Sequence, residues 1–387
     1  ENKNAPLLYN LAELQNDCSK YFKISPDETL RIVQELYEKK MTTYPRTDAR
    51  VLSTAVAKEI HKNIGGLRNY ALAAPFAKEV LEQGTYKNIA KTRYVNDKQI
   101  TDHYAIIPTG QGLNNLAGLA PTAAKVYEVI VRRFLSIFYP PAVYQKFSLT
   151  LQVKEESFFA SFKVLIQEGY LKVTDFSFKK ENTAQKEDKE NENESADEKC
   201  DAELTNLLTH LKKGDTLSVD IYEIKEGETS PPKRYTSGSI ILTMENAGQF
   251  IEDEELRAQI KGSGIGTSAT RAEILKKLVN IEYLALNKKT QVLTPTQMGE
   301  MIYDVVSDSI RPLLNPALTA SWEKGLTMVA DGVITPDDYM GKLTDFVGRR
   351  TVAVRGLNNQ GVLWRQFQAT EEFYQKKQKQ SNAKNKE

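Results

Sequence analysis

The residues with the clearest chemical potential lie in the segment TTYPRTD at residues 42–48. Tyr44 carries a hydroxyl that could act as a nucleophile, but a phenol with a pKa of about 10 reacts poorly at neutral pH unless a nearby charge assists it. Arg46 follows across Pro45, and a guanidinium grips phosphate oxygens bidentately while it stays charged. The spacing indicates tyrosine attack on a phosphate, although an ordinary turn is the plainer interpretation of this segment alone.

A second suggestive segment is TDHYAIIPT at residues 101–109, in which His103 precedes an apolar run. A histidine can donate a hydrogen bond to a phosphate oxygen, and its titration near neutral pH permits proton transfer. When this segment is considered alone, a histidine packed beneath a loop is the commoner arrangement.

A third segment, KGSGIGTSATR at residues 261–271, is rich in glycine and leads into an amphipathic helix. We expect Thr267 to be the N-cap of this helix. Backbone N–H groups at such a helix start bind phosphate readily. Thr270 and Arg271 are expected to face the same anion. The segment lacks the Gly-Lys-Ser/Thr ending of a Walker P-loop, so no ATP site is predicted. A flexible loop that caps a core helix is the alternative.

Basic residues offer a weaker signal. Lys233 and Arg234, in PPKRYT at residues 231–236, could contact a nucleic acid backbone or a stacked base, although a solvated turn is the plainer interpretation. The net charge is only +1, but the stretch at residues 179–203 is acidic. If that stretch is disordered, the folded body is more basic than the total and weakly favours a polyanionic partner.

Helix signals surround the candidate tyrosine. Ser25 as N-cap, Pro26 at the first helical position and Glu28 placed for a capping box predict a helix start. Pro45 disfavours helical geometry at Tyr44, so Tyr44 is expected on an extended turn just beyond this helix. Two further helices are predicted over residues 54–61 and 121–137.

Downstream of these helices, the residue composition changes. Segments rich in β-branched and aromatic residues predict strands at residues 147–153, 158–166, 170–178 and 215–224. The acidic stretch at 179–203 is nearly free of apolar residues and is expected to be a disordered insertion. Residues 267–294 are typical of a helix followed by a short β wing, as in winged-helix DNA binders. The chain from residue 371 is expected to be a frayed tail.

These patterns predict a mixed α+β, multidomain fold for the 387 residues. The expected parts are a helical domain carrying the tyrosine, a β-rich domain with the acidic insertion, a second helical domain, and a C-terminal extension with its tail, over residues 1–137, 138–232, 233–350 and 351–387.

Composition narrows the setting. The two cysteines, Cys18 and Cys200, cannot build a disulfide framework or a four-cysteine zinc site, which favours a reducing, cytoplasmic location. No apolar run approaches the roughly 20 residues that a membrane-spanning helix needs. The first residue is Glu1 rather than Met, so a piece excised from a longer polypeptide is expected.

The order of the motifs is more specific than any one of them. YPRTD, DHYAIIPT, PPKRYT, GIGTSATRAEIL and LTPTQMGE follow one another in this order, and the series resembles type IA DNA topoisomerases. It is most similar to the topoisomerase III branch, whose members carry TYPRTD, HAIIPT and GIGTPATR-type segments. The resemblance covers residues 7–332. Tyr104, inserted before the alanine, and Ser268, where the family commonly has Pro or Glu, depart from the pattern.

The resemblance implies a fold and a chemistry. Tyr44 would form a 5′-phosphotyrosyl bond with one DNA strand, and Arg46 and His103 would steady the scissile phosphate. Thr270 and Arg271 would lie along a single-strand groove, and the β-rich domain would be a hinge or gate in the family's toroid. The family's N-terminal Toprim domain, which binds Mg²⁺, has no counterpart before Tyr44. The chain alone is therefore expected to bind single-stranded DNA without cleaving it.

The expected intact enzyme needs Mg²⁺ but no ATP, works as a monomer in the cytoplasm beside the nucleoid, and has a RecQ-type helicase as a potential partner. Two alternatives stay open. One is a non-catalytic winged-helix regulator, in which Tyr44 only packs. The other is a tyrosine recombinase, although in that class the Arg, His and Arg cluster precedes the tyrosine, whereas Tyr44 comes first.

Overall fold

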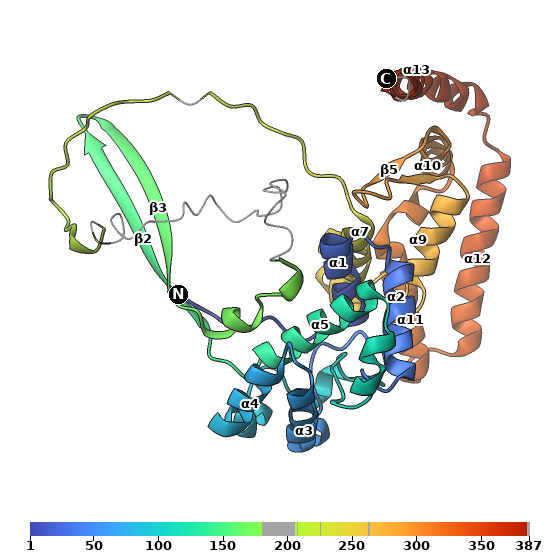
Figure 1. Ribbon diagram of the computed structural model, residues 1–387. Helices are drawn as coiled ribbons and strands as arrows, with labels where there is room; N and C mark the ends of the chain where they lie inside the picture. Colours follow the sequence, from blue (N-terminus) through green and yellow to red (C-terminus); the bar gives the residue numbers. More distant parts are fainter. Residues whose placement is uncertain (180–205, 207, 225, 262–263, 385–387) are drawn as a thin grey trace. The chain divides into compact units, whose positions relative to one another are not determined.

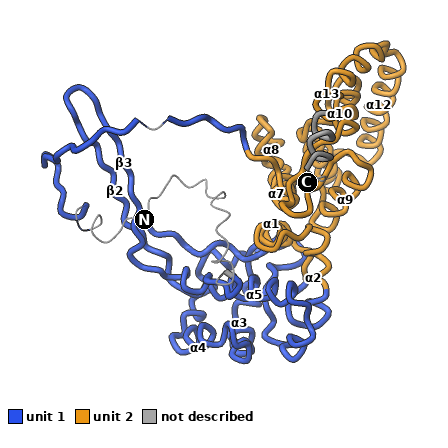
Figure 2. The backbone as a smooth tube through the Cα atoms, turned by 45° about the horizontal axis from the view of Figure 1, so that its top comes forward, with its two compact units in different colours: residues 1–9, 35–44, 49–232 blue, residues 10–34, 45–48, 233–387 orange. Residues whose placement is uncertain are grey.

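The computed structural model of the chain describes residues 1–179, 206, 208–224, 226–261 and 264–384. They fall into two compact units (Figure 2). Unit 1 comprises Glu1–Tyr9, Glu35–Tyr44 and Ala49–Pro232, and unit 2 comprises Asn10–Gln34, Pro45–Asp48 and Lys233–Glu387. The chain therefore leaves unit 1 for unit 2 directly after Tyr44. The acidic insertion predicted at 179–203 lies outside the described residues, apart from Lys179.

Unit 1 is organised around helix α5 (Pro121–Ser136), which begins with proline in its first turn. Val126, Ile130 and Phe134 on this helix are fully buried, as expected of a helix enclosed on most sides. Other helical elements in the described part of unit 1 include α3 (Thr54–Gly66), η1 (Leu67–Asn69), α4 (Ala74–Gln83), η2 (Thr85–Lys91), η3 (Asp97–Gln99), η4 (Leu113–Gly118), η5 (Gly169–Val173) and η6 (Ser177–Lys179). Helices α3 and α5 match the prediction.

Strands β1 (Asn2–Lys3), β2 (Ala142–Val153) and β3 (Glu156–Gln167) form an antiparallel sheet in the order β1-β2-β3 (Figure 1). β2 and β3 are a hairpin whose register runs from Val143 opposite Gln167 to Val153 opposite Glu156. Two of the four predicted strands are thus confirmed.

The other two predicted strands are wrong. At residues 170–178 the chain forms η5 and η6 instead, because Gly169 has a φ of 51° and the Tyr170 N–H donates to the Pro140 oxygen. Tyr170, Val173 and Phe176 are then all buried, at a spacing of three that suits a 3-10 turn. The described residues of 215–224 form no strand, and Ile221 is 83% exposed. Strand propensity alone does not hold a strand that lacks a partner.

Unit 2 joins the beginning of the chain to its second half. Helix α1 (Leu11–Phe22) packs on α7 (Ser237–Glu245), and Ala12 and Ile241 share a core with Leu275 and Leu293. The other elements are η8 (Ala247–Phe250), α8 (Glu254–Ile260), α9 (Arg271–Asn280), β4 (Leu284–Leu286), β5 (Leu293–Pro295), α10 (Gln297–Ile310), η9 (Arg311–Leu314), α11 (Pro316–Ala330), α12 (Pro336–Arg355) and α13 (Gln360–Lys384).

Helix α2 (Pro26–Glu38) begins in unit 2 and ends in unit 1. Its start matches the prediction, since the Glu28 N–H donates to the Ser25 hydroxyl at 3.2 Å. The domain boundaries drawn from the sequence placed residues 10–34 with the rest of 1–137, whereas they fall in unit 2; those boundaries stay a prediction.

The end of unit 2 matches one prediction and contradicts another. α9 is followed by the antiparallel pair β4 and β5, in the order that the helix-and-wing pattern predicts. The frayed tail expected from residue 371 is wrong, because the backbone is helical to Lys384. That stretch is rich in Gln, Lys and Glu, which are good helix formers. Each helix within the described ranges is too short or too polar to span a membrane.

Candidate active site

Backbone pairing brings the tyrosine and histidine segments together in unit 1. The Thr43 N–H donates to the Ile107 oxygen at 3.0 Å, and the Thr43 hydroxyl donates to the Ala105 oxygen and accepts from the Ile107 N–H, both at 3.0 Å. Thr42 forms an antiparallel bridge with Pro108. Tyr44 therefore follows an extended stretch just past α2, as the sequence predicts.

Three aromatic rings meet at the tyrosine. The ring centroids of Tyr44 and His103 are 4.5 Å apart at 44°, and Tyr37 packs edge-on against Tyr44 at 5.4 Å. Tyr44 and His103 line one open cavity of about 530 Å³, together with Tyr104 and Lys40. Burial raises the pKa of Tyr104. The cavity therefore brings a phenol hydroxyl, an imidazole ring and a lysine ammonium group together within one unit.

Two residues with contacts to the predicted site residues were not singled out in the sequence, namely Tyr37 and Gln34. Tyr37 packs on Tyr44, and its aromatic ring close before the TTYPRTD segment was the available signal. Gln34 accepts from Arg46 Nη1 at 2.9 Å, and both of these residues belong to unit 2. Nothing in the sequence pointed to Gln34.

The glycine-rich segment folds differently from the prediction. α9 begins at Arg271, with Thr270 at the N-cap position, so Thr267 is not the cap. Instead, the Thr267 N–H donates to the Thr270 hydroxyl at 2.9 Å. Gly264 and Gly266, with φ of 67° and 69°, turn the chain into this arrangement. Thr267 and Thr270 are both exposed.

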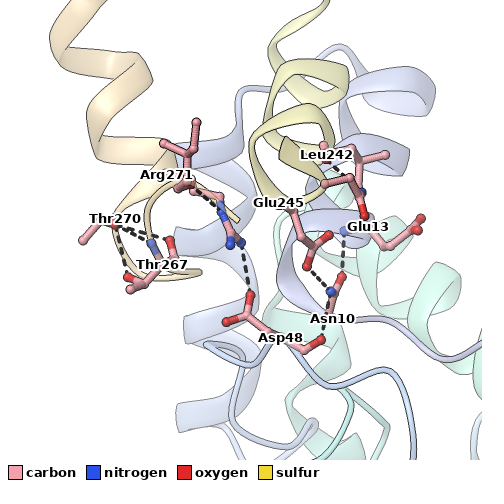
Figure 3. A network of polar contacts seen from close by, with 10 residues as sticks. Asn10, Glu13, Asp48, Leu242, Glu245, Thr267, Thr270 and Arg271 are labelled. Atoms are coloured by element: carbon pink, nitrogen blue, oxygen red, sulfur yellow. Dashed lines mark hydrogen bonds and ion pairs between the residues drawn. The ribbon is translucent and has the colours of Figure 1, made fainter. Parts of the chain in front are cut away.

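Arg271 points to Asp48 rather than to the exposed threonines (Figure 3). Its guanidinium is 1% exposed, Nη1 lies 3.1 Å from Asp48 Oδ1, and Nε donates to the Ile265 oxygen at 3.1 Å. All of these residues belong to unit 2. The expectation that Arg271 and Thr270 face one anion does not match this geometry.

The remaining candidates lie outside regular structure. Lys233 and Arg234 are exposed on a stretch without regular structure that leads into α7. Within the described ranges, no three His, Cys, Asp or Glu side chains are grouped so that they could hold a metal ion. The described residues therefore do not supply the set of ligands that the magnesium site of the intact enzyme would need.

Known proteins share both the sequence and the fold. A family model described as DNA topoisomerase matches residues 1–341. The chain is 33% identical over 358 residues to DNA topoisomerase 3 of Bacillus licheniformis, covering 92% of this chain and 45% of that protein. It is 34% identical over 332 residues to DNA topoisomerase 3 of Bacillus subtilis strain 168, covering 85% of this chain and 42% of that protein. The chain thus spans less than half the length of these relatives.

The fold is similar to that of full-length topoisomerase I from Thermotoga maritima, with a TM-score of 0.56 at 20% identity, covering 90% of this chain and 50% of that one. The mixed helical and sheet fold and the resemblance predicted from the motif order are both confirmed. The motif series, the fold and the family match over residues 1–341 agree: the chain belongs to the type IA DNA topoisomerases, on the topoisomerase III branch.

Proposed function

We propose that Tyr44 is the nucleophile with which the intact enzyme transiently breaks one DNA strand. The observation that carries this proposal is the packing of Tyr44 on His103 at an open cavity, in a chain of the type IA family. A tyrosine buried in the core would serve only packing, whereas this one lines a space that a substrate can enter.

The proposed step is a transesterification. The Tyr44 hydroxyl oxygen bonds to phosphorus, the bond from phosphorus to the 3′ oxygen of the preceding nucleotide breaks, and the 5′ phosphate stays on the tyrosine. One proton leaves the tyrosine and one joins the departing 3′ oxygen. Because one phosphate ester replaces another, the 3′ hydroxyl can reverse the reaction without ATP. A second strand passes through the gap before resealing.

Two basic side chains stabilise the charge that develops on phosphate. His103 donates a hydrogen bond to a phosphate oxygen, and Arg46 supplies a permanent charge through a planar fork. The exposed residues Thr267, Thr270, Lys233 and Arg234 of unit 2 are proposed contacts to single-stranded DNA, dominated by phosphate.

Other features belong to the intact protein. Its Mg²⁺ is held by residues outside this chain, in the proposed Toprim domain, and it acts as a monomer on DNA in the cytoplasm, with a RecQ-type helicase as a proposed partner. This chain by itself binds single-stranded DNA but does not cleave it.

The test is covalent trapping with the full-length protein. An oligonucleotide labelled on the 5′-phosphate side of the break is incubated with Mg²⁺, denatured and separated on a gel. We expect a protein–DNA adduct with the unchanged protein and none with Tyr44→Phe, which removes only a hydroxyl. Single-strand affinity should stay within about twofold, because phosphate contacts dominate it.

Tyr86→Phe is the matched control, since Tyr86 lies in unit 1 beside His61 and away from the cavity; it should form the adduct normally. An adduct that persists in Tyr44→Phe would rule out Tyr44 as the nucleophile. DNA binding with no adduct from the unchanged protein would favour the non-catalytic regulator.

A further inference from the structure

Asp48 follows the proposed nucleophile Tyr44 closely in sequence and forms an ion pair with Arg271. The proposed cleavage step assigns no role to this ion pair. We propose that Arg271 is a positioning residue: by binding Asp48, it holds the segment Pro45–Asp48, which directly follows the nucleophile, in the conformation that the cleavage reaction needs. This inference rests on the proposed function of Tyr44.

The segment Pro45–Asp48 has no regular structure of its own. Contacts from elsewhere in unit 2 therefore determine its path. The Leu11 N–H at the start of α1 donates to the Thr47 oxygen at 3.1 Å, and Asn10 Nδ2 donates to the Asp48 oxygen at 3.1 Å. Arg46 Nη1 donates to Gln34 Oε1 at 2.9 Å, and Arg271 adds a fourth connection, an ion pair with the Asp48 side chain (Figure 3).

Burial restricts the geometry of the ion pair between Arg271 and Asp48. Arg271 is 1% exposed while the Asp48 side chain is 36% exposed, so the arginine can move far less than its partner. A buried guanidinium requires a counter-charge and hydrogen-bond acceptors. Asp48 supplies the charge, and the Ile265 oxygen of the glycine-rich segment supplies an acceptor. The planar fork of arginine links these two at a fixed angle.

A second carboxylate sharpens the requirement for the cation. Glu245 on α7 accepts from Asn10 Nδ2 at 2.6 Å. Burial raises the pKa of Glu245, the charge of Arg271 opposes that rise, and Asp48 and Glu13 add to it. Without Arg271, the carboxylates of Asp48 and Glu245 would repel each other. The expected response is displacement of the residues that follow Tyr44.

A DNA contact and a positioning role predict different kinetics. A side chain that grips phosphate affects binding and its salt dependence. A side chain that positions the nucleophile affects the rate of the bound complex, where a displacement of about 1 Å can cost about 100-fold.

The experiment measures the cleavage rate at saturating oligonucleotide, and the dissociation constant across salt concentrations, with the full-length protein and Mg²⁺. We expect Arg271→Gln and Asp48→Asn each to slow cleavage by about 30-fold. Binding should stay within about twofold with an unchanged salt slope. The double variant should be no slower than either single one, because both remove the same interaction.

Arg271→Lys keeps the cation and should restore part of the rate. Lys276→Gln is the matched control: it removes a cation from the same helix, but from an exposed pair with Asp27 at 3.1 Å, and should leave rate and binding unchanged. If Arg271→Gln is unfolded by circular dichroism, Asp48→Asn and Arg271→Lys decide the matter.

Weaker binding with a salt slope lowered by about one, and an unchanged rate at saturation, would overturn the inference and make Arg271 a DNA contact. Multiplied losses in the double variant would also overturn it. An unchanged protein that forms no adduct would overturn the proposed function itself, and this inference with it.

Discussion

The histidine segment at residues 101–109 and the glycine-rich segment at 261–271 make an instructive pair. Both contain a basic residue that the sequence suggests as a phosphate ligand. His103 is exposed and packs on the ring of Tyr44 beside an open cavity. Arg271 is buried and paired with Asp48. A basic side chain in a motif can therefore lie exposed at a cavity or lie buried in an ion pair, and we propose that burial distinguishes a substrate contact from a positioning residue.

Local backbone structure explains the difference. The histidine segment is extended and pairs with Thr43, which leaves His103 at the open end of that pairing. The glycine-rich segment instead turns into α9, whose buried face carries Arg271, Ala272 and Leu275. Positions three and four apart share a helix face, and Leu275 lies four after Arg271 and three after Ala272, so the first residue of α9 enters the core of unit 2.

The largest expected effect that would test this contrast is on catalysis. His103→Gln should slow cleavage at saturating DNA by about 100-fold, because it removes the imidazole proposed to donate to the phosphate. The melting temperature should hardly change, since His103 is exposed. His61→Gln, an exposed histidine on α3, is the control and should cleave normally. A normal rate together with a lowered melting temperature would make His103 a structural residue.

The next effect concerns stability of the glycine-rich segment. Gly264→Ala should lower the free energy of unfolding by about 2 kcal/mol more than Gly266→Ala, as measured by urea denaturation. Both glycines have positive φ and share the strain of a left-handed residue. A β-carbon at Gly264 would also overlap the backbone oxygens of Met244 and Glu245, whereas at Gly266 the nearest atoms belong to side chains at 3.3 Å. Equal losses would mean that this segment is loosely packed.

The smallest effect is a pH dependence of stability. Burial raises the pKa of Glu245 above its ordinary 4.5, so the folded state binds this proton more tightly than the unfolded state does. The contribution is present at pH below about 4.5 and is lost as pH rises through the raised pKa. Glu245→Gln should lack this decline in unfolding free energy, as urea denaturation at several pH values will measure.

Glu254→Gln, an exposed position in the first turn of α8, should keep the decline. If the unfolding free energies of the unchanged protein and of Glu245→Gln vary with pH in parallel, Glu245 is not coupled to Asp48 and Arg271. The contrast between the two segments would then have no electrostatic contribution from Glu245.

The sequence alone determined the features that depend on near neighbours in the chain. Ser25 and Pro26 start α2, Pro121 starts α5, and the β-branched and aromatic residues at 147–153 and 158–166 lie in the hairpin. Caps, proline geometry and periodicity act within a few residues, so they can be recognised without a fold. The order of the motifs likewise identified the family.

Tertiary structure decided what depends on partners distant in the sequence. Residues 170–178 have strand composition, yet their apolar side chains are buried in short 3-10 turns. The sequence suggests Arg271 as a DNA ligand, and the structure pairs it with Asp48, which lies 223 positions away. The free energy of a side chain depends on burial and counter-charge, and chain packing sets both. The sequence thus indicated which residue types could act on a phosphate, and the fold determined that Arg271 is buried while His103 is exposed.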